Sequence, residues 1–197
     1  MSRSVTLDPE TLLHAYAQGV FPMADRDGSI HWYTADPRGV MPLDDTFHVP
    51  GTLKQLVRSA KFDVRINYDF PRTMQSCMTA RLGETWINPD LIFAYTRLHQ
   101  LGYAHSVECW LDAKLVGGLY GVSLGAAFFG ESMFHTERDA SKVALVHLVE
   151  RLRERSFELL DTQATTPHLR TFGCTDIPAA EYAKRLERAL PRECKFD

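Results

Sequence analysis

The chain has 197 residues, a formal net charge of −3 and 45% hydrophobic residues. This length allows one main domain with a sizeable core, and the composition is that of a folded, soluble protein. The slight acidity argues against a protein that coats nucleic acid along a large basic surface, but it leaves room for a local basic patch. No apolar stretch approaches the roughly 20 residues of a membrane span, so we expect no membrane segment.

The cysteines and the start of the chain indicate a cytoplasmic protein. The four cysteines are widely spaced and form no C-x-x-C pair, and no secretory h-region opens the chain. A secreted protein with a disulfide framework would begin with a secretory leader, and a C-x-x-C pair would indicate a redox or metal site. We therefore expect reduced thiols and a cytoplasmic location.

Residues 1–50 are expected to form a small N-terminal lobe. Asp8-Pro9-Glu10 combines a capping residue, a proline at the first helical position and an acid in the first turn. These residues predict a short opening helix that ends at Gly19. Residues 20–50 are rich in proline and short apolar pairs, which predicts brief strands and loops, with residues 30–33 as the clearest strand.

Residues 51–197 are expected to form the main domain, an α/β (α+β) fold. The spacing of apolar residues, capping residues and turns predicts helices and strands in alternation. Helices are expected at 52–59, through 74–78, at 88–102, from Asp139 onward and at 177–190, and strands at 62–66, 106–111, 115–123, 126–134 and 157–160. This order predicts a mixed sheet flanked by helices, with a hairpin turn at 112–114.

Three polar residues stand in apolar, strand-like runs. Glu131 interrupts the aromatic run 128–134, and Asp161 and Gln163 close another run. Buried polar groups are costly unless each has a partner or a task. Asp161 and Gln163 are two positions apart, so on an extended chain they share a face, where a carboxylate and a carboxamide can orient an amine and relay its proton. A structural ion pair at Glu131 and a polar turn at 161–166 are the open alternatives.

Other chemical signatures are weak. The eight histidines lack the spacing of zinc ligands, and no Walker loop, G-x-S-x-G or dinucleotide fingerprint occurs, so we expect neither metal nor cofactor. A local basic surplus contains Lys54 and Arg58, which are neighbours at i and i+4 on a helix, together with Lys61 and Arg65. Such a cluster can contact phosphates, although it is more often a solvated face.

Together these segments resemble the leucyl/phenylalanyl-tRNA–protein transferase family. Gly130-Glu131-Ser132-Met133-Phe134 and Asp161-Thr162-Gln163 match the family's motifs. Further matching blocks are found, in the family's order, at 16–22, 32–40, 85–87, 104–108 and 116–122. Ordered blocks over most of the chain are more specific than any one motif.

The resemblance implies an enzyme that moves leucine or phenylalanine from aminoacyl-tRNA to the N-terminal Lys or Arg of a protein, which marks that protein for degradation. It implies a GNAT-like fold, a monomer and catalysis without a cofactor. By analogy, Asp161 would polarise Gln163, Gln163 would help take the proton of the attacking amine, and Glu131 would help hold the acceptor.

The resemblance also implies a substrate site. The residues that match the family's substrate-binding positions are Met23, Trp86, Leu119, Tyr120, Phe128, Met133, Leu145, Leu148 and Thr166. An adaptable methionine would suit either leucine or phenylalanine, although the helix positions could equally be simple core. The basic residues Lys54, Arg58, Lys61 and Arg65 fall where the family shows positive charge for the tRNA acceptor stem.

The chain departs from the family's pattern in three places. It lacks a longer N-terminal segment with a Gly-Gly-Asp-Leu pattern, so we expect a reduced lobe. Met23 stands where some members have a tryptophan that stacks on the terminal adenine, and Thr166 replaces a common asparagine. The alternative functions are a GNAT-like transferase that uses acyl-CoA, against which the missing pyrophosphate loop argues, and a tRNA- or N-degron-binding module without catalysis.

Overall fold

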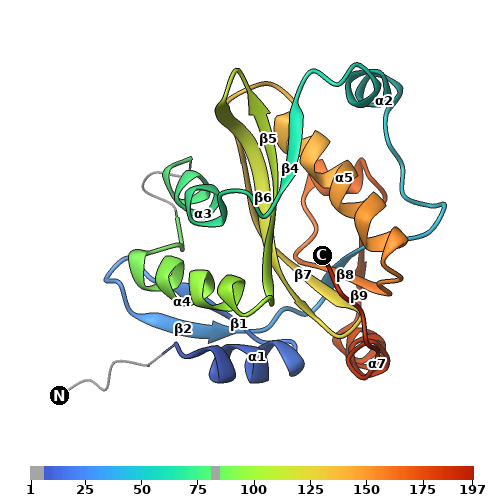
Figure 1. The fold of residues 1–197 in the computed structure, drawn as a ribbon. Helices are drawn as coiled ribbons and strands as arrows, with labels where there is room; N and C mark the ends of the chain where they lie inside the picture. Colours follow the sequence, from blue (N-terminus) through green and yellow to red (C-terminus); the bar gives the residue numbers. More distant parts are fainter. Residues whose placement is uncertain (1–6, 81–84) are drawn as a thin grey trace.

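The computed structural model describes residues 7–80 and 85–197 as two sheets with helices packed around them (Figure 1). The strands are β1 Phe21–Ala24, β2 Ile30–Tyr33, β3 Arg38–Met41, β4 Asp63–Ile66, β5 Ala104–Leu111, β6 Lys114–Leu124, β7 Ala127–His135, β8 Leu159–Gln163 and β9 Thr175–Ile177. The helices are α1 Pro9–Ala17, α2 Gly51–Arg58, α3 Phe70–Thr79, α4 Pro89–Gln100, α5 Ala140–Glu154, α6 Pro167–Arg170 and α7 Ala179–Ala189. β1 and β2 form a small antiparallel pair, and the main sheet has the order β4-β5-β6-β7-β8-β3-β9.

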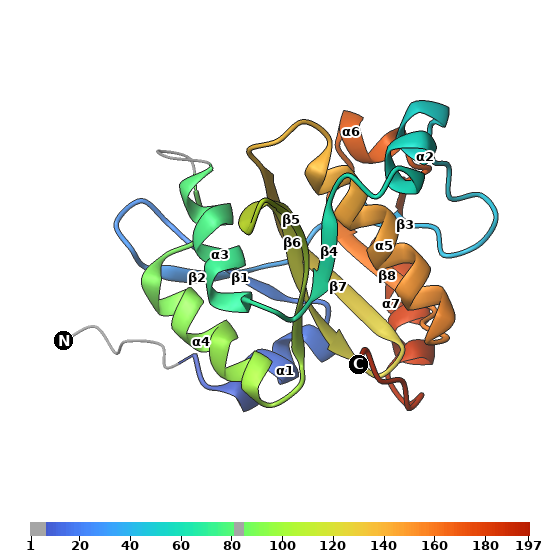
Figure 2. The same cartoon turned by 45° about the horizontal axis from the view of Figure 1, so that its top comes forward.

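Helices cover both faces of the main sheet, which confirms the predicted mixed sheet flanked by helices. Figure 2 shows α3, α4 and the β1–β2 pair on one side of the long strands, and α5 with α2 on the other. The buried residues accordingly form two clusters. One contains Tyr16, Leu91 and Tyr95, and the other contains Leu145 and Val149 from α5. Within the described residues, no helix is long and apolar enough to cross a membrane.

The predicted helix starts at Asp8, Asn88 and Asp139 are confirmed, and two of these three residues cap their helix with a side-chain hydrogen bond. Asp8 accepts a hydrogen bond from the Thr11 backbone N–H at 2.9 Å, and Asn88 caps α4 in the same way. Asp139 does occupy the position before α5, but its side chain makes no capping bond. Its φ of 65° is outside the extended region that side-chain capping requires, and its carboxylate binds Lys142 at 2.5 Å instead.

Near the C-terminus, the first and last residues of the strands and of the last helix differ from those that the sequence predicted. β8 begins at Leu159 and extends to Gln163, so the polar residues belong to the strand rather than following it. The last helix begins at Ala179 because residues 175–177 form β9, which pairs with β3. A strand of three residues depends on a distant partner for its hydrogen bonds, and local periodicity does not show such a partner.

β3 carries part of the N-terminal region into the main sheet. It lies between β8 and β9 and is antiparallel to both, although it falls within the range 1–50 that we expected to form the lobe. Arg38 at its start is only 2% exposed. A charged side chain can be buried to this extent only with a partner, and the partner lies on β8.

Glu131 lies where the main sheet is irregular in two ways, at a β-bulge and at the end of a strand pairing. Between β6 and β7 the register shifts, so that Gly121 lies opposite Gly130 and Tyr120 opposite Ser132, which leaves Glu131 as the extra residue of a β-bulge. The parallel pairing of β7 with β8 ends where Phe129 meets Asp161. Glu131 and the end of β8 therefore flank the point at which the two strands stop pairing.

Candidate active site

The Glu131 carboxylate is held through only one of its oxygens. Oε1 accepts hydrogen bonds from the Tyr16 hydroxyl at 2.7 Å and from Gln163 Nε2 at 3.0 Å. The Tyr16 hydroxyl also bonds to the Tyr95 hydroxyl, so α1 and α4 both support this carboxylate. Oε2 has no hydrogen-bond partner among the residues that the structure describes. The carboxylate is therefore oriented and still has one oxygen that can accept a hydrogen bond.

The surroundings of Glu131 raise its pKa into the range of neutral pH. Burial raises the pKa of Glu131 to about 8, and the nearby negative charge of Asp161 acts in the same direction. The hydrogen bond from Tyr16 and the charge of Arg38 lower this pKa but do not cancel the effect of burial. A group with a pKa near the working pH is well suited to accept and return a proton.

Asp161 is fully buried and fully bonded. Its two oxygens accept hydrogen bonds from Arg38 Nε at 2.9 Å and Nη2 at 2.6 Å, from the Tyr182 hydroxyl at 2.7 Å and from the Gln163 backbone N–H at 2.7 Å. Arg38 Nη1 also donates to the Gly19 carbonyl at 2.9 Å. Asp161 thus joins β8 to β3 and α7, and Arg38 extends this network to the loop after α1.

The side chains of Asp161 and Gln163 bind different partners. Gln163 has a left-handed backbone with φ of 62°, which breaks the alternation of an extended strand. Its side chain reaches Glu131, whereas the Asp161 side chain reaches Arg38. Asp161 contacts Gln163 only through the main-chain N–H, so the carboxylate positions the backbone that carries the amide.

A cavity of about 370 Å³ opens beside Glu131 and unites most of the predicted substrate residues. Nine residues of the predicted site line it: Trp86, Leu119, Tyr120, Glu131, Met133, Leu145, Leu148, Gln163 and Thr166. Leu160 completes an apolar wall, and Ser132, Thr162 and His168 add polar groups. The cavity therefore has an apolar side formed with α5 and a polar side formed by the β7 bulge.

Two predicted substrate residues lie outside this lining. Phe128 is fully buried and stacks on Phe196 with ring centroids 5.3 Å apart, so it supports the sheet behind the cavity. Met23 lies half-buried on β1. The Ala24 backbone N–H donates to the Trp86 carbonyl at 3.0 Å, which places β1 beside the segment that carries Trp86.

Thr166 lines the cavity and also begins α6. Its hydroxyl accepts a hydrogen bond from the Leu169 backbone N–H at 3.2 Å. One lone pair of the hydroxyl is thus used locally, while its proton stays free to be donated. The threonine that replaces the family's asparagine therefore keeps one polar group at the cavity.

The predicted basic cluster lies on α2, on β4 and on the segment between them, and none of its four residues lines the cavity at Glu131. Lys54 and Arg58 are exposed and have no ion-pair partner within residues 7–80 and 85–197. Lys61 pairs with Glu137 at 3.3 Å, and Arg65 pairs with Asp63 at 2.6 Å. The two residues on α2 are therefore the uncompensated charges of the cluster.

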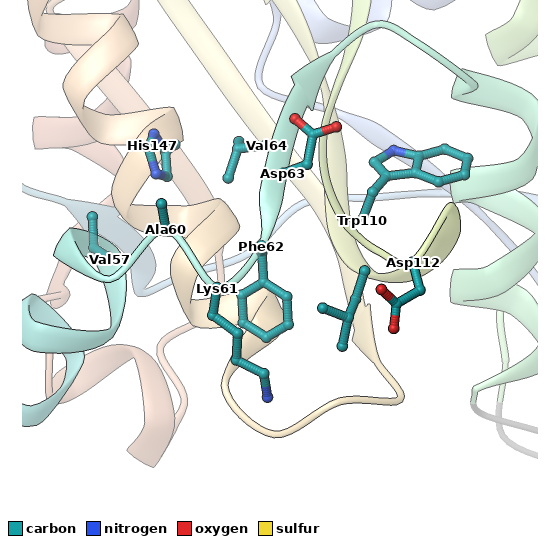
Figure 3. Close-up of a pocket in the computed structure, with 10 residues that line it drawn as sticks. Val57, Ala60, Lys61, Phe62, Asp63, Val64, Trp110, Asp112 and His147 are labelled. Carbon is teal, nitrogen blue, oxygen red and sulfur yellow. The ribbon is translucent and has the colours of Figure 1, made fainter.

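A second cavity, of about 570 Å³, lies beside this cluster (Figure 3). Asp63 lines it from the start of β4 and Lys61 from the segment before β4, while His147 comes from α5 and Trp110 from β5. It shares no lining residue with the cavity at Glu131. Its charged groups are of both signs, so the lining favours no particular ligand.

The sequence interpretation missed the residues that support the carboxylates. Arg38, Tyr16 and Tyr182 make the bonds to Asp161 and Glu131, and none of them was predicted to take part in the site. Arg38 precedes Gly39-Val40-Met41, so the argument that singled out Glu131, a charged residue in an apolar run, could have found it. In the described part of the chain, no three His, Cys, Asp or Glu residues group as metal ligands.

Comparison with known sequences places the chain in one family. The profile described as leucyl/phenylalanyl-tRNA protein transferase matches residues 40–187, and the profile of that family's N-terminal domain matches residues 6–36. A leucyl/phenylalanyl-tRNA–protein transferase of Herpetosiphon aurantiacus is 53% identical over 96% of this chain and 98% of its own length. Its counterpart in Maricaulis maris is 54% identical over 95% of this chain and 88% of its own length.

Among solved structures, that of FemX is similar in fold. It has a TM-score of 0.52 and 12% identity, over 90% of this chain and 64% of that chain. This likeness concerns the fold alone. The two profiles and the identity above 50% over nearly the whole length are decisive: the chain belongs to the leucyl/phenylalanyl-tRNA–protein transferase family.

Proposed function

We propose that this protein transfers leucine or phenylalanine from aminoacyl-tRNA to the N-terminal Lys or Arg of an acceptor protein, as a monomer in the cytoplasm. The observation that carries the proposal is that Glu131, which lines an apolar cavity, has an unpaired carboxylate oxygen among the described residues. An acceptor amine needs a proton acceptor, and a leucyl or phenylalanyl side chain needs an apolar wall. The cavity offers both within one space.

Glu131 is the group that takes the proton from the attacking amine. The amide of Gln163 is not a base, and every oxygen of Asp161 is already bonded to donors. The amine nitrogen attacks the ester carbonyl carbon, the C–N bond forms, and the bond to the ribose oxygen breaks. The amine proton passes to Glu131 and then to the leaving ribose oxygen, so the carboxylate is regenerated.

Gln163 and Tyr16 act by positioning the carboxylate. Both donate to Oε1, which leaves Oε2 able to accept the proton of the amine. The ester is already activated, so no covalent enzyme intermediate is needed, and orientation of amine and ester supplies most of the acceleration.

The apolar wall holds the side chain of the transferred amino acid. Leu119, Met133, Leu145 and Leu148 come from β6, β7 and α5 and offer no polar group to it. Methionine has three rotatable bonds and can repack around a branched or an aromatic side chain. This adaptability supports acceptance of both leucine and phenylalanine.

The tRNA contacts α2 through phosphates and reaches the cavity with its 3′ end. Lys54 and Arg58 are exposed and uncompensated, which is the property that phosphate contacts require. Lys61 and Arg65 extend the basic surface, and Trp86 with the neighbouring Met23 receives the terminal adenine. Weakening of binding with added salt, and a smaller salt slope in a Lys54→Ala/Arg58→Ala variant, are the expected results.

The direct test is transfer to a peptide. The protein is incubated with leucyl-tRNA or phenylalanyl-tRNA and a peptide that begins with Arg, and the extended peptide is detected by mass spectrometry. A matched peptide that begins with Glu controls for acceptor choice, and acetyl-CoA replaces the tRNA in a further reaction. Extension of the Arg peptide alone is expected, whereas an acetylated peptide without aminoacyl product would refute the proposal.

A further inference from the structure

The Ser132 hydroxyl is the second unpaired polar group at the Glu131 cavity. Ser132 is 8% exposed, it lines the cavity, and its Oγ has no hydrogen-bond partner among the described residues. Serine hydroxyls buried elsewhere in the chain are bonded: Ser123 binds His105 at 3.0 Å, and Ser106 binds Glu108 at 2.7 Å. An unpaired buried hydroxyl costs stability, so its position beside the carboxylate requires an explanation.

The β-bulge turns Ser132 to the same side of the sheet as Glu131. Ser132 lies opposite Tyr120 on β6, and residues opposite each other in an antiparallel pair share a face. Tyr120 packs against Tyr95 on this face, and Glu131 bonds to Tyr16 on it. In a regular strand, two successive residues would point to opposite faces. The extra residue of the bulge therefore brings both unpaired polar atoms to one side.

Met133, the next residue, points to the other face. It lies opposite Leu119, and both pack with the cluster around α5. A substrate that crosses the gap beyond the β7–β8 pairing can place its apolar side chain against Met133 and its reacting carbon near Glu131 and Ser132. Three consecutive residues would thus contact the side chain, the carbonyl group and the amine of the reacting pair.

We propose that the Ser132 hydroxyl donates a hydrogen bond to the carbonyl oxygen of the aminoacyl ester and stabilises the negative charge that forms there when the amine attacks. This assignment rests on the proposed function. As the C–N bond forms, the carbonyl π electrons move to that oxygen, and they return when the bond to the ribose oxygen breaks. A preoriented donor in a buried site stabilises this charge more than it stabilises the neutral carbonyl.

The test compares Ser132→Ala with Ser123→Ala. Ser123 is also 8% exposed, but its hydroxyl lies away from the Glu131 cavity, so it is a matched control for removing a buried hydroxyl. Three quantities are measured for each variant: the single-turnover rate of transfer at saturating substrates, the Kd of an analogue with an amide in place of the aminoacyl ester, and the midpoint of thermal unfolding.

For Ser132→Ala, the single-turnover rate should fall by about 10²-fold, which is typical of removing one such donor. The analogue Kd and the peptide KM should stay within about threefold, because the donor acts mainly on the charged intermediate. The unfolding midpoint should not fall, because the lost hydroxyl has no partner in the protein. Ser123→Ala should keep the wild-type rate.

Other outcomes overturn the assignment. An unchanged rate in Ser132→Ala, with wild-type transfer intact, shows that the hydroxyl does not act on the carbonyl while the proposed function stands. A raised peptide KM or a weakened analogue Kd at an unchanged rate assigns the hydroxyl to ground-state binding instead. If the wild-type protein shows no transfer, the proposed function fails, and this inference fails with it.

Discussion

Arg38 and Asp161 are 123 positions apart in the sequence and form two hydrogen bonds, of 2.9 and 2.6 Å, in the interior of the main sheet. Arg38 is 2% exposed and Asp161 0%. The planar guanidinium matches the two carboxylate oxygens, and the Tyr182 hydroxyl adds a third donor at 2.7 Å. This pair fixes β3 beside β8 and leaves Asp161 without free acceptors for a substrate.

Loss of the Arg38 side chain should destabilise the protein strongly. In Arg38→Met the buried Asp161 charge loses its counter-ion, and the free energy of unfolding should fall by about 3–5 kcal/mol. Urea denaturation measures this change. Arg170→Met is the control, because the Arg170–Asp176 pair is exposed and should contribute less than about 1 kcal/mol. Equal losses in the two variants would show that the buried pair has no special role.

The pH dependence of stability should report the buried carboxyl of Glu131. Its pKa of about 8 in the folded protein exceeds the ordinary value of 4.5, so the folded state keeps a proton that the unfolded state releases. Stability should therefore decrease as pH rises from about 4.5 to about 8, by at most about 1.4 kcal/mol per pH unit, and become level above that. Glu131→Gln should remove this slope.

Urea denaturation between pH 6.5 and 9 is the suitable measurement. Below this window, burial lowers the pKa of His105 to about 4, so that His105 contributes a slope of opposite sign. The difference between wild type and Glu131→Gln isolates the carboxyl. Parallel curves for the two proteins would mean that Glu131 is ionised throughout this range.

A β-carbon at Gly121 should disrupt the bulge that carries Glu131. It would overlap the Phe129 carbonyl oxygen and the Phe128 ring, and the backbone on both sides is held by the sheet. Gly121→Ala should lose about 1–3 kcal/mol of stability and most of the transfer activity. Gly51→Ala is the control, because no atom lies near a β-carbon built there. A stable and active Gly121→Ala protein would contradict this account of the bulge.

Shortening Met133 should change the choice of amino acid. Met133→Ala widens the apolar wall, so the ratio of kcat/KM for phenylalanyl-tRNA over leucyl-tRNA should rise by about tenfold. Met78→Ala removes an equally unbranched side chain from the other hydrophobic cluster and should leave the ratio unchanged. Competition between the two charged tRNAs for one peptide measures the ratio, and equal ratios in all three proteins would place the transferred side chain elsewhere.

The sequence pattern correctly predicted those elements that are stabilised by contacts between residues close together in the sequence. The capping residues Asp8 and Asn88 were found because a cap acts on its own helix, and the hairpin of β5 and β6 was found because its turn residues are contiguous. β3 and β9 were missed, because each depends on pairing with a segment far along the chain.

In the site, too, the feature visible in the local sequence was predicted, and the feature that depends on the folded backbone was not. Glu131 stood out in the sequence as a charge among aromatic residues, and in the structure it lines the cavity with one carboxylate oxygen unpaired among the described residues. The bond from the Gln163 amide to Glu131 could not be predicted, because it depends on a left-handed backbone that the Asp161 carboxylate supports through the Gln163 N–H. A motif of two polar residues in three positions therefore concealed two different tasks.

The hydrogen bond from Tyr16 to Glu131 connects two parts of the chain that different family profiles match. Tyr16 lies in the part of the chain that matches the family's N-terminal domain, and Glu131 lies in the part that matches the main profile. The two parts therefore share one reacting group and are not independent modules. A chimera that exchanges residues 6–36 between distant relatives can keep both folds intact and still misdirect a single oxygen atom.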